Sequence, residues 1–135
     1  MMYPIKEFDD NGNLTHYKDS EGYEWWKEYD EKGNIIQFKD SDGFKDWRGY
    51  DEKGNQTYYK NSDGYERWAE YDDKRNLIHF KNSNGFESWG EFDNKGNMSC
   101  SLRSYSDGTI NTKNKHLFSK ELKRKYKLLL LRRKK

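Results

Sequence analysis

The groups that could do chemistry in this chain are two repeat-related histidines, one cysteine and many carboxylates, and their spacing forms no standard site. Segment 40–43, Asp-Ser-Asp-Gly, is similar to the end of a calcium-binding loop. That loop needs further acidic ligands where this chain has Phe38 and Gly49, so the segment is interpreted as a plain turn. His16 and His79 would lie about 29 Å apart on a flat sheet, too far to share one metal ion. We therefore expect no metal site and no cofactor.

Cys100 and the carboxylates also suggest no catalytic arrangement. Cys100 is the chain's one cysteine, so an internal disulfide is excluded and a reducing, cytoplasmic location is expected. No histidine or aspartate is predicted to orient its thiol, which favours a structural role. The acidic side chains recur at every turn and strand, a distribution more typical of solubility and charge pairing than of one acid–base pair. We expect that the chain is not an enzyme and acts on no small-molecule substrate.

A 21-residue repeat dominates the sequence and must set the positions of these side chains. Tryptophans follow one another at this interval, and aromatic-Asp pairs, glycines and a further aromatic position keep the same step. A fixed period of this length is typical of an array whose units cannot bury their apolar faces alone and therefore stack on their neighbours. The repeated tryptophans are Trp26, Trp47, Trp68 and Trp89.

Each unit is predicted to contain two short strands and two turns. In the second unit, 34–39 and 44–50 are strand candidates, and 40–43 and 51–54 are turns. The second turn has the pattern Asp-x-x-Gly-Asn, which fits a type I turn followed by a glycine in the left-handed conformation. Short strands separated by such turns predict a hairpin meander. Residues 1–112 are therefore expected to form an all-β domain of about five units and about ten antiparallel strands.

Side-chain parity places aromatic residues on both faces of the predicted sheet. Successive residues of a strand point to opposite faces, so the strand 23–29 presents Trp25 on one face and Trp26 on the other. Hydrophobic residues make up 31% of the chain and aromatic residues 17%, which leaves too few aliphatic side chains for a two-layer globule. Cross-strand aromatic and Lys–Glu pairs, each contributing about 0.2–1 kcal/mol, would hold the sheet together. The pattern predicts a single-layer or wrapped sheet.

Two departures from the repeat are expected to be weak points. Arg75 stands where the other turns of this kind have glycine, and a left-handed conformation there would cost roughly 1 kcal/mol. In the fifth unit the Ser-Asp-Gly turn, 106–108, falls two residues late and no tryptophan follows. Terminal repeats are often atypical caps. We expect the Arg75 turn to be the loosest and the fifth unit to end the array.

Residues 113–135 differ from the rest and are expected to form a basic amphipathic helical tail. They carry 11 basic side chains and one acidic side chain, whereas residues 1–112 carry 15 basic and 23 acidic side chains. Ser119 is a candidate N-cap for the helix. Its apolar stripe would consist of Phe118, Leu122, Tyr126, Leu129 and Leu130.

Three kinds of partner fit the charge of this tail. It could dock on the acidic sheet of its own chain, bind nucleic acid by displacing phosphate counterions, or contact an acidic protein or membrane surface. A membrane partner is not favoured, and the apolar run 128–131 is far shorter than the roughly 20 residues that span a bilayer. The polyanion-binding candidates are Lys123, Arg124, Lys127, Arg132 and Arg133.

The repeat resembles two known kinds of bacterial hairpin repeat. Segment 49–55, Gly-Tyr-Asp-Glu-Lys-Gly-Asn, resembles Tyr-Asp (RHS-type) repeats, and the alternating glycine and aromatic positions also look like MORN-type repeats. The resemblance covers roughly residues 3–99, and segment 71–76 departs from it at Arg75. It implies a β-meander or shell that binds, wraps or scaffolds other molecules. The Lys-, Asn-, Asp- and Tyr-rich composition looks like that of a low-GC bacterium or one of its phages.

The sequence predicts protein binding through the aromatic, acidic sheet surface. Trp and Tyr are favoured at protein interfaces, although the repeated tryptophans could simply hold the sheet together. Trp25 and Tyr58 fall outside the repeated tryptophan positions, so they are the stronger contact candidates. An alternative is a phage-type inhibitor of a bacterial defence system, such as an anti-CRISPR protein, whose acidic body mimics nucleic acid. A third hypothesis is direct nucleic-acid binding by residues 113–135.

Overall fold

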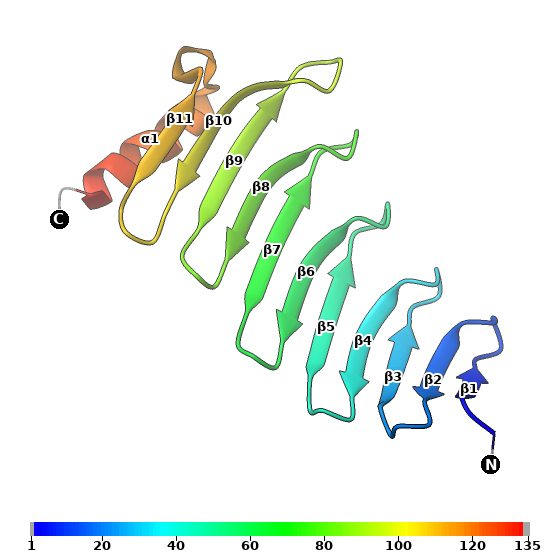
Figure 1. Ribbon diagram of the computed structural model, residues 1–135. Helices are drawn as coiled ribbons and strands as arrows, with labels where there is room; N and C mark the ends of the chain where they lie inside the picture. Colours follow the sequence, from blue (N-terminus) through cyan, green and yellow to red (C-terminus); the bar gives the residue numbers. More distant parts are fainter. Residues whose placement is uncertain (1, 134–135) are drawn as a thin grey trace. The chain divides into compact units, whose positions relative to one another are not determined.

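The computed structural model describes residues 2–133, and these form a series of hairpins followed by one helix (Figure 1). Contacts group the chain into two compact units, residues 1–66 and 67–135, with the boundary at the first residue of the seventh strand. In each unit every strand pairs antiparallel with the next strand of the chain. The strands are β1 (Ile5–Phe8), β2 (Leu14–Lys18), β3 (Glu24–Tyr29), β4 (Ile35–Asp40), β5 (Lys45–Tyr50), β6 (Gln56–Asn61), β7 (Glu66–Tyr71), β8 (Leu77–Asn82), β9 (Glu87–Phe92), β10 (Met98–Ser104) and β11 (Ile110–Lys113).

The predicted all-β meander with a C-terminal helix is confirmed. Residues 2–133 contain eleven strands where the sequence predicted about ten, and the last of them ends at Lys113, one residue into the segment assigned to the tail. Among these residues β1 pairs only with β2 and β11 only with β10, so both are edge strands.

One turn geometry joins strand after strand. In the turn after β3, the Gly33 N–H donates to the Asp30 carbonyl over 3.1 Å, and the Asp30 carboxylate accepts from the backbone N–H of Lys32 and Asn34, both at 2.9 Å. Gly33 has a φ of 85°, as the pattern Asp-x-x-Gly-Asn predicted. The carboxylate therefore replaces hydrogen bonds that a short turn would otherwise leave to water. These backbone bonds, the largest cause, lower the pKa of Asp30.

A β-bulge recurs at the start of the first strand of the repeat. Opposite β3, Ile35 pairs with Tyr29 and Gln37 with Glu28, so Ile36 is the extra residue. The same register shift occurs between Glu7 and Phe8, Gly49 and Tyr50, Glu70 and Tyr71, and between Met98 and Cys100. A bulge increases local twist and changes which residues share a face. The strict alternation of side chains between the two faces therefore holds only for the strand residues that follow the bulge.

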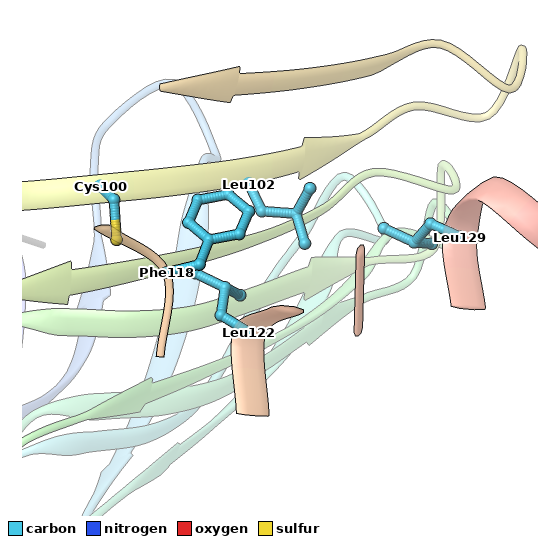
Figure 2. Packing of buried hydrophobic residues seen from close by; sticks show 5 residues of the cluster. All are labelled: Cys100, Leu102, Phe118, Leu122 and Leu129. Carbon is cyan, nitrogen blue, oxygen red and sulfur yellow. The ribbon is translucent and has the colours of Figure 1, made fainter. Parts of the chain in front are cut away.

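The C-terminal segment closes the second unit with its own small core. A short turn, η1 (Lys115–Leu117), leads into the helix α1 (Lys120–Arg133). The predicted N-cap is confirmed, because the Leu122 N–H donates to Ser119 Oγ at 3.2 Å. The buried cluster combines residues of β10 with the apolar stripe of the helix (Figure 2). It consists of Cys100, Leu102, Phe118, Leu122 and Leu129, with Trp89, Ile110 and Tyr126 packed against it.

The late turn of the fifth unit follows a longer strand. β10 has seven residues, whereas β8, at the same place in the preceding repeat, has six, so the strand accounts for one of the two residues of the delay. None of the helices in the described part of the chain is long and apolar enough to cross a membrane.

The Arg75 turn provides a test of backbone strain. Arg75 has a φ of 68°, and its N–H still donates to the Asp72 carbonyl over 3.0 Å, as glycine does in the equivalent turns. We expect Arg75→Gly to be more stable than Arg75→Ala by about 1 kcal/mol, because both lose the arginine side chain and only glycine relieves the left-handed strain. Urea unfolding of the two variants measures the difference. Equal unfolding midpoints would contradict the strain.

Candidate protein-interaction surface

In each compact unit one surface of the strands carries two of the repeated tryptophans, and we name this surface of each unit the Trp face. In the first unit it presents Trp26 and Trp47, and in the second Trp68 and Trp89. The residues that pair with them across the next strand also belong to this face. They are Lys39, Lys60, Lys81 and Leu102, in chain order.

The indoles of Trp26 and Trp89 stack on histidines of the preceding strands. The His16 and Trp26 rings lie 5.2 Å apart with an interplanar angle of 9°, and the His79 and Trp89 rings lie 5.3 Å apart at 10°. Stacking of this kind stabilises a ring pair beyond its area burial. Each histidine is thus part of the repeat packing. Residues 2–133 contain no cluster of three or more His, Cys, Asp or Glu side chains arranged for a metal ion.

Each stacked histidine is also held between two glutamates. His16 Nδ1 lies 2.8 Å from Glu7 Oε1, and its Nε2 lies 2.6 Å from Glu24 Oε2. The hydrogen bond with Glu7 and then the one with Glu24 raise the pKa of His16. In the second unit, His79 lies between Glu70 at 3.3 Å and Glu87 at 2.8 Å. The Trp face is therefore a pattern of aromatic rings bordered by hydrogen-bonded carboxylates.

The two candidates outside the repeated tryptophan positions lie on opposite faces. Tyr58 belongs to the Trp face, where its hydroxyl donates to Glu66 Oε2 over 2.6 Å. Trp25 lies on the other face, stacked on Tyr17 at 5.7 Å and 15°, with Lys27 Nζ 4.1 Å from its ring centre. Both side chains are half-buried. The structure does not bring Trp25 and Tyr58 together into one contact site.

The face opposite the Trp face is held by aromatic pairs and by one buried ion pair. Phe38 and Phe44 rings lie 6.2 Å apart, and Phe80 and Phe86 rings 6.0 Å apart. Asp46 is 2% exposed and accepts two hydrogen bonds from the Arg48 guanidinium, at 2.9 and 3.1 Å. These bonds, the largest cause, raise the pKa of Arg48. Sequence reasoning missed this pair, since neither residue repeats.

Exposure separates the repeated tryptophans into two pairs. Trp47 and Trp68 are 38% and 40% exposed, whereas Trp26 and Trp89 are half-buried. Lys39 Nζ lies 5.1 Å from the Trp26 ring centre, and Trp89 packs against the helix core. Trp47 and Trp68 are thus the repeated tryptophans with the most ring surface open to a partner.

The helix covers the Trp face in the second unit at β10. Two polar repeat positions become apolar there: the position of His16, Gln37, Tyr58 and His79 is taken by Cys100, and that of Lys18, Lys39, Lys60 and Lys81 by Leu102. Cys100 and Leu102 are both fully buried beneath the helix segment. This pair of substitutions was the signal in the sequence that could have located the docking site of the tail.

Glu91 anchors the beginning of the helix. Its Oε1 accepts the Ser119 N–H over 2.9 Å and the Cys100 S–H over 3.2 Å. Burial on its own would raise the pKa of Glu91, but the bonds from Ser119 and Cys100 outweigh it and leave that pKa lowered. Burial and the neighbouring carboxylate raise the pKa of the Cys100 thiol to about 11. The thiol is therefore neutral at physiological pH, which suits a packing role better than a nucleophilic one.

The five polyanion-binding candidates of the tail lie outside these docking contacts. All five are exposed, and none of their side chains forms a hydrogen bond or ion pair within residues 2–133. The contacts that dock the helix are those of the apolar cluster and of Glu91. The candidates are Lys123, Arg124, Lys127, Arg132 and Arg133.

The fold is similar to parts of much larger solved proteins. The crystal structure of TcdB2-TccC3-Cdc42 matches with a TM-score of 0.62 and 17% identity, over 75% of this chain and 5% of that chain. The Photorhabdus luminescens Tc holotoxin pore matches at 0.60 and 17%, and TcdB2-TccC3-TEV at 0.60 and 18%, with the same coverage. This chain thus spans about 5% of the length of the chains it matches. Neither a family model nor a curated protein matches it. The likeness shows a shared β-hairpin repeat fold.

Replacing Glu91 tests how the helix is anchored. Glu91→Ala is expected to destabilise the second unit by about 1–3 kcal/mol, because it leaves the Ser119 N–H and the Cys100 S–H without their charged acceptor. Thermal unfolding followed by circular dichroism measures the loss. Glu28→Ala is the matched control, because Glu28 holds the same repeat position and forms no hydrogen bond or ion pair within residues 2–133.

The effect of Glu91 should depend on pH in one direction. Because its pKa is lowered in the folded state, the carboxylate stabilises the fold above the ordinary glutamate pKa of about 4.3. That stability is lost as the pH falls through the lower, folded-state value. The stability difference between the wild type and Glu91→Ala should therefore shrink between about pH 6 and about pH 3. A constant difference would contradict this role.

Proposed function

We propose that this protein is a non-enzymatic scaffold of Tyr-Asp (RHS-type) repeats that binds another protein through its Trp face. The observation that carries the proposal is the exposure of Trp47 and Trp68, at 38% and 40%, on a surface otherwise lined with carboxylates and lysines. A half-open indole offers a large apolar area at small entropic cost, and the charged border supplies orientation.

The Tyr-Asp assignment is supported by the hydrogen bonds that the Tyr, Asp and Asn residues of the motif form. The Tyr50 hydroxyl donates to the Ile35 carbonyl over 2.7 Å and so links one repeat to the previous one. The Asp51 carboxylate accepts the Asn55 N–H at 2.9 Å and its side-chain amide at 3.0 Å. The Tyr, Asp and Asn of the motif thus have specific bonds, whereas the MORN-type alternative rests on glycine and aromatic spacing alone.

The solved relatives of the fold support a scaffolding role. Their structures combine several proteins, TcdB2 with TccC3 and in one case with Cdc42. By analogy with these multi-protein structures, we propose that this chain also holds another protein. The inhibitor hypothesis, with its anti-CRISPR and nucleic-acid-mimic forms, stays a prediction from composition, because no contact or groove favours it over a general protein partner.

Trp47 provides the test of this proposal. The immobilised wild type should retain a protein from bacterial lysate, identified by mass spectrometry, and Trp47→Ser should retain at least about tenfold less, as for a hot spot worth 1.4 kcal/mol or more. Tyr23→Ser is the matched control, because Tyr23 is 36% exposed and lies on the opposite face. Equal losses for both variants, or none for either, would refute a binding role for the Trp face.

Polyanion binding by α1 is a second candidate function. Its outward basic side chains are exposed and unpaired within residues 2–133, and Glu121 is the one acidic residue of the helix. An unneutralised cluster of this kind attracts phosphate groups and releases their counterions. The docked helix would present the cluster on a fixed support.

Salt dependence tests the second function. Replacing Lys123, Arg124 and Lys127 by Gln should lower the slope of log affinity against log salt for a single-stranded oligonucleotide by about two, at about 0.7 per phosphate contact. A triple variant in the sheet, Lys6→Gln, Lys18→Gln and Lys95→Gln, controls for net charge. An equal change of slope in both variants would contradict a specific role of α1 in polyanion binding.

A further inference from the structure

The Trp face contains a groove that recurs three repeats later. The first groove, of about 600 Å³, is lined by Glu7, His16, Trp26, Glu28, Gln37 and Lys39, among others. The second, of about 530 Å³, has Glu70, His79, Trp89 and Glu91 at the corresponding repeat positions. Each groove lies within one compact unit.

The two grooves have the same framework. The histidine–tryptophan stacks agree within 0.1 Å in ring separation and 1° in angle, from 5.2 Å and 9° to 5.3 Å and 10°. In both, the same pair of glutamate positions holds the histidine. Because the framework is repeated, the segment that packs at one groove indicates which kind of segment fits the other.

The beginning of α1 forms one wall of the second groove. Leu122 and Lys125 of the helix line it together with Trp89, Glu70 and Asp72. Glu91 accepts the N–H of the helix N-cap residue, Ser119, at 2.9 Å. This part of the Trp face therefore has an apolar helix side chain near its indole, a basic one beside its carboxylates, and a helix N-terminus at one glutamate.

The first groove has the same acceptors, and no helix within residues 2–133 lines it. The Glu28 side chain is exposed and forms no hydrogen bond or ion pair with these residues, although it holds the repeat position of Glu91. We propose that this groove binds an amphipathic helix of a partner protein, with the helix N-terminus at Glu28. This rests on the proposed function and specifies the partner segment. The apolar residue of that helix would cover Trp26, and a basic residue three positions later would face Glu7.

The groove also specifies where the partner helix must differ from α1. In the second unit Phe118 packs against Cys100 and Leu102 (Figure 2). The first unit has Gln37 and Lys39 at these two repeat positions, so an aromatic ring there would cover an amide and an ammonium group. An acidic side chain in place of Phe118 would instead pair with Lys39. The partner helix is therefore expected to be acidic before its N-cap, apolar in its first turn and basic in its second.

Two synthetic peptides test the proposal against the full chain. One has the sequence of residues 115–133, and the other carries Phe118→Glu in the same sequence. Fluorescence anisotropy of the labelled peptides should show one binding site per chain, with the Phe118→Glu peptide binding about threefold tighter, as a charge pair worth about 0.7 kcal/mol gives. Lys39→Glu in the protein should reverse this order. Glu28→Gln should weaken both peptides, whereas Glu52→Gln, in an exposed turn, should weaken neither.

Three results would overturn the helix proposal. The first is that neither peptide binds. The second is that Glu28→Gln and Lys39→Glu leave the binding unchanged. The third is that binding depends on Glu91, because the peptide would then replace α1 at the second groove. A dimer in size-exclusion chromatography that dissociates on deletion of the tail would also overturn it, because the occupant would be a second copy of this chain. If lysate capture still depends on Trp47, the protein-binding function stands and only the helical partner is refuted.

Discussion

The constraint on which this protein depends is that a single layer of strands has no interior. A strand here cannot bury a side chain against a second sheet, so cohesion comes from rings that stack across neighbouring strands and from turns that satisfy their own backbone groups. The His16–Trp26 stack and the Asp30 turn are the two basic units of that cohesion. Both are short-range, so each repeat needs its own set of such contacts.

This short-range cohesion also explains why the Trp face is so polar. A stacked ring needs its edge groups satisfied, and the glutamates beside His16 and His79 do this while they keep the surface charged. At the end of the array Cys100 and Leu102 replace polar residues, and α1 covers them. The array thus ends where two polar positions become apolar and receive a helix.

Much of the fold could be predicted from the sequence, because turn chemistry is local. Asp, Gly and Asn at fixed offsets specified each hairpin, and Ser119 specified the start of the helix. The bulge at Ile36 could not be predicted from alternation, since an inserted residue changes the parity on which that prediction relies. The docking of α1 was hidden by its charge: the basic residues suggested electrostatic attraction to the sheet, whereas the contacts that hold it are apolar.

The candidate surface was predicted in part. The spacing of the tryptophans predicted a shared face, and within each unit the register places its two tryptophans on one face. Exposure could not be predicted from spacing. Trp47 and Trp68 are 38% and 40% exposed, whereas Trp26 stacks on His16 and Trp89 packs against the helix core. Trp25 stood out in the sequence because it broke the pattern, yet its ring is engaged with Tyr17 and Lys27.

Because the C-terminal cap consists of few residues, the number of repeats in the array can change without affecting the cap. The cluster under α1 draws only on residues from Trp89 onward. Duplicating or deleting an interior 21-residue segment would therefore leave the cap intact, and each event would add or remove one complete pair of strands. Proteins that descend from such a gene would differ in the number of strands and of aromatic positions while they keep the same C-terminal cap.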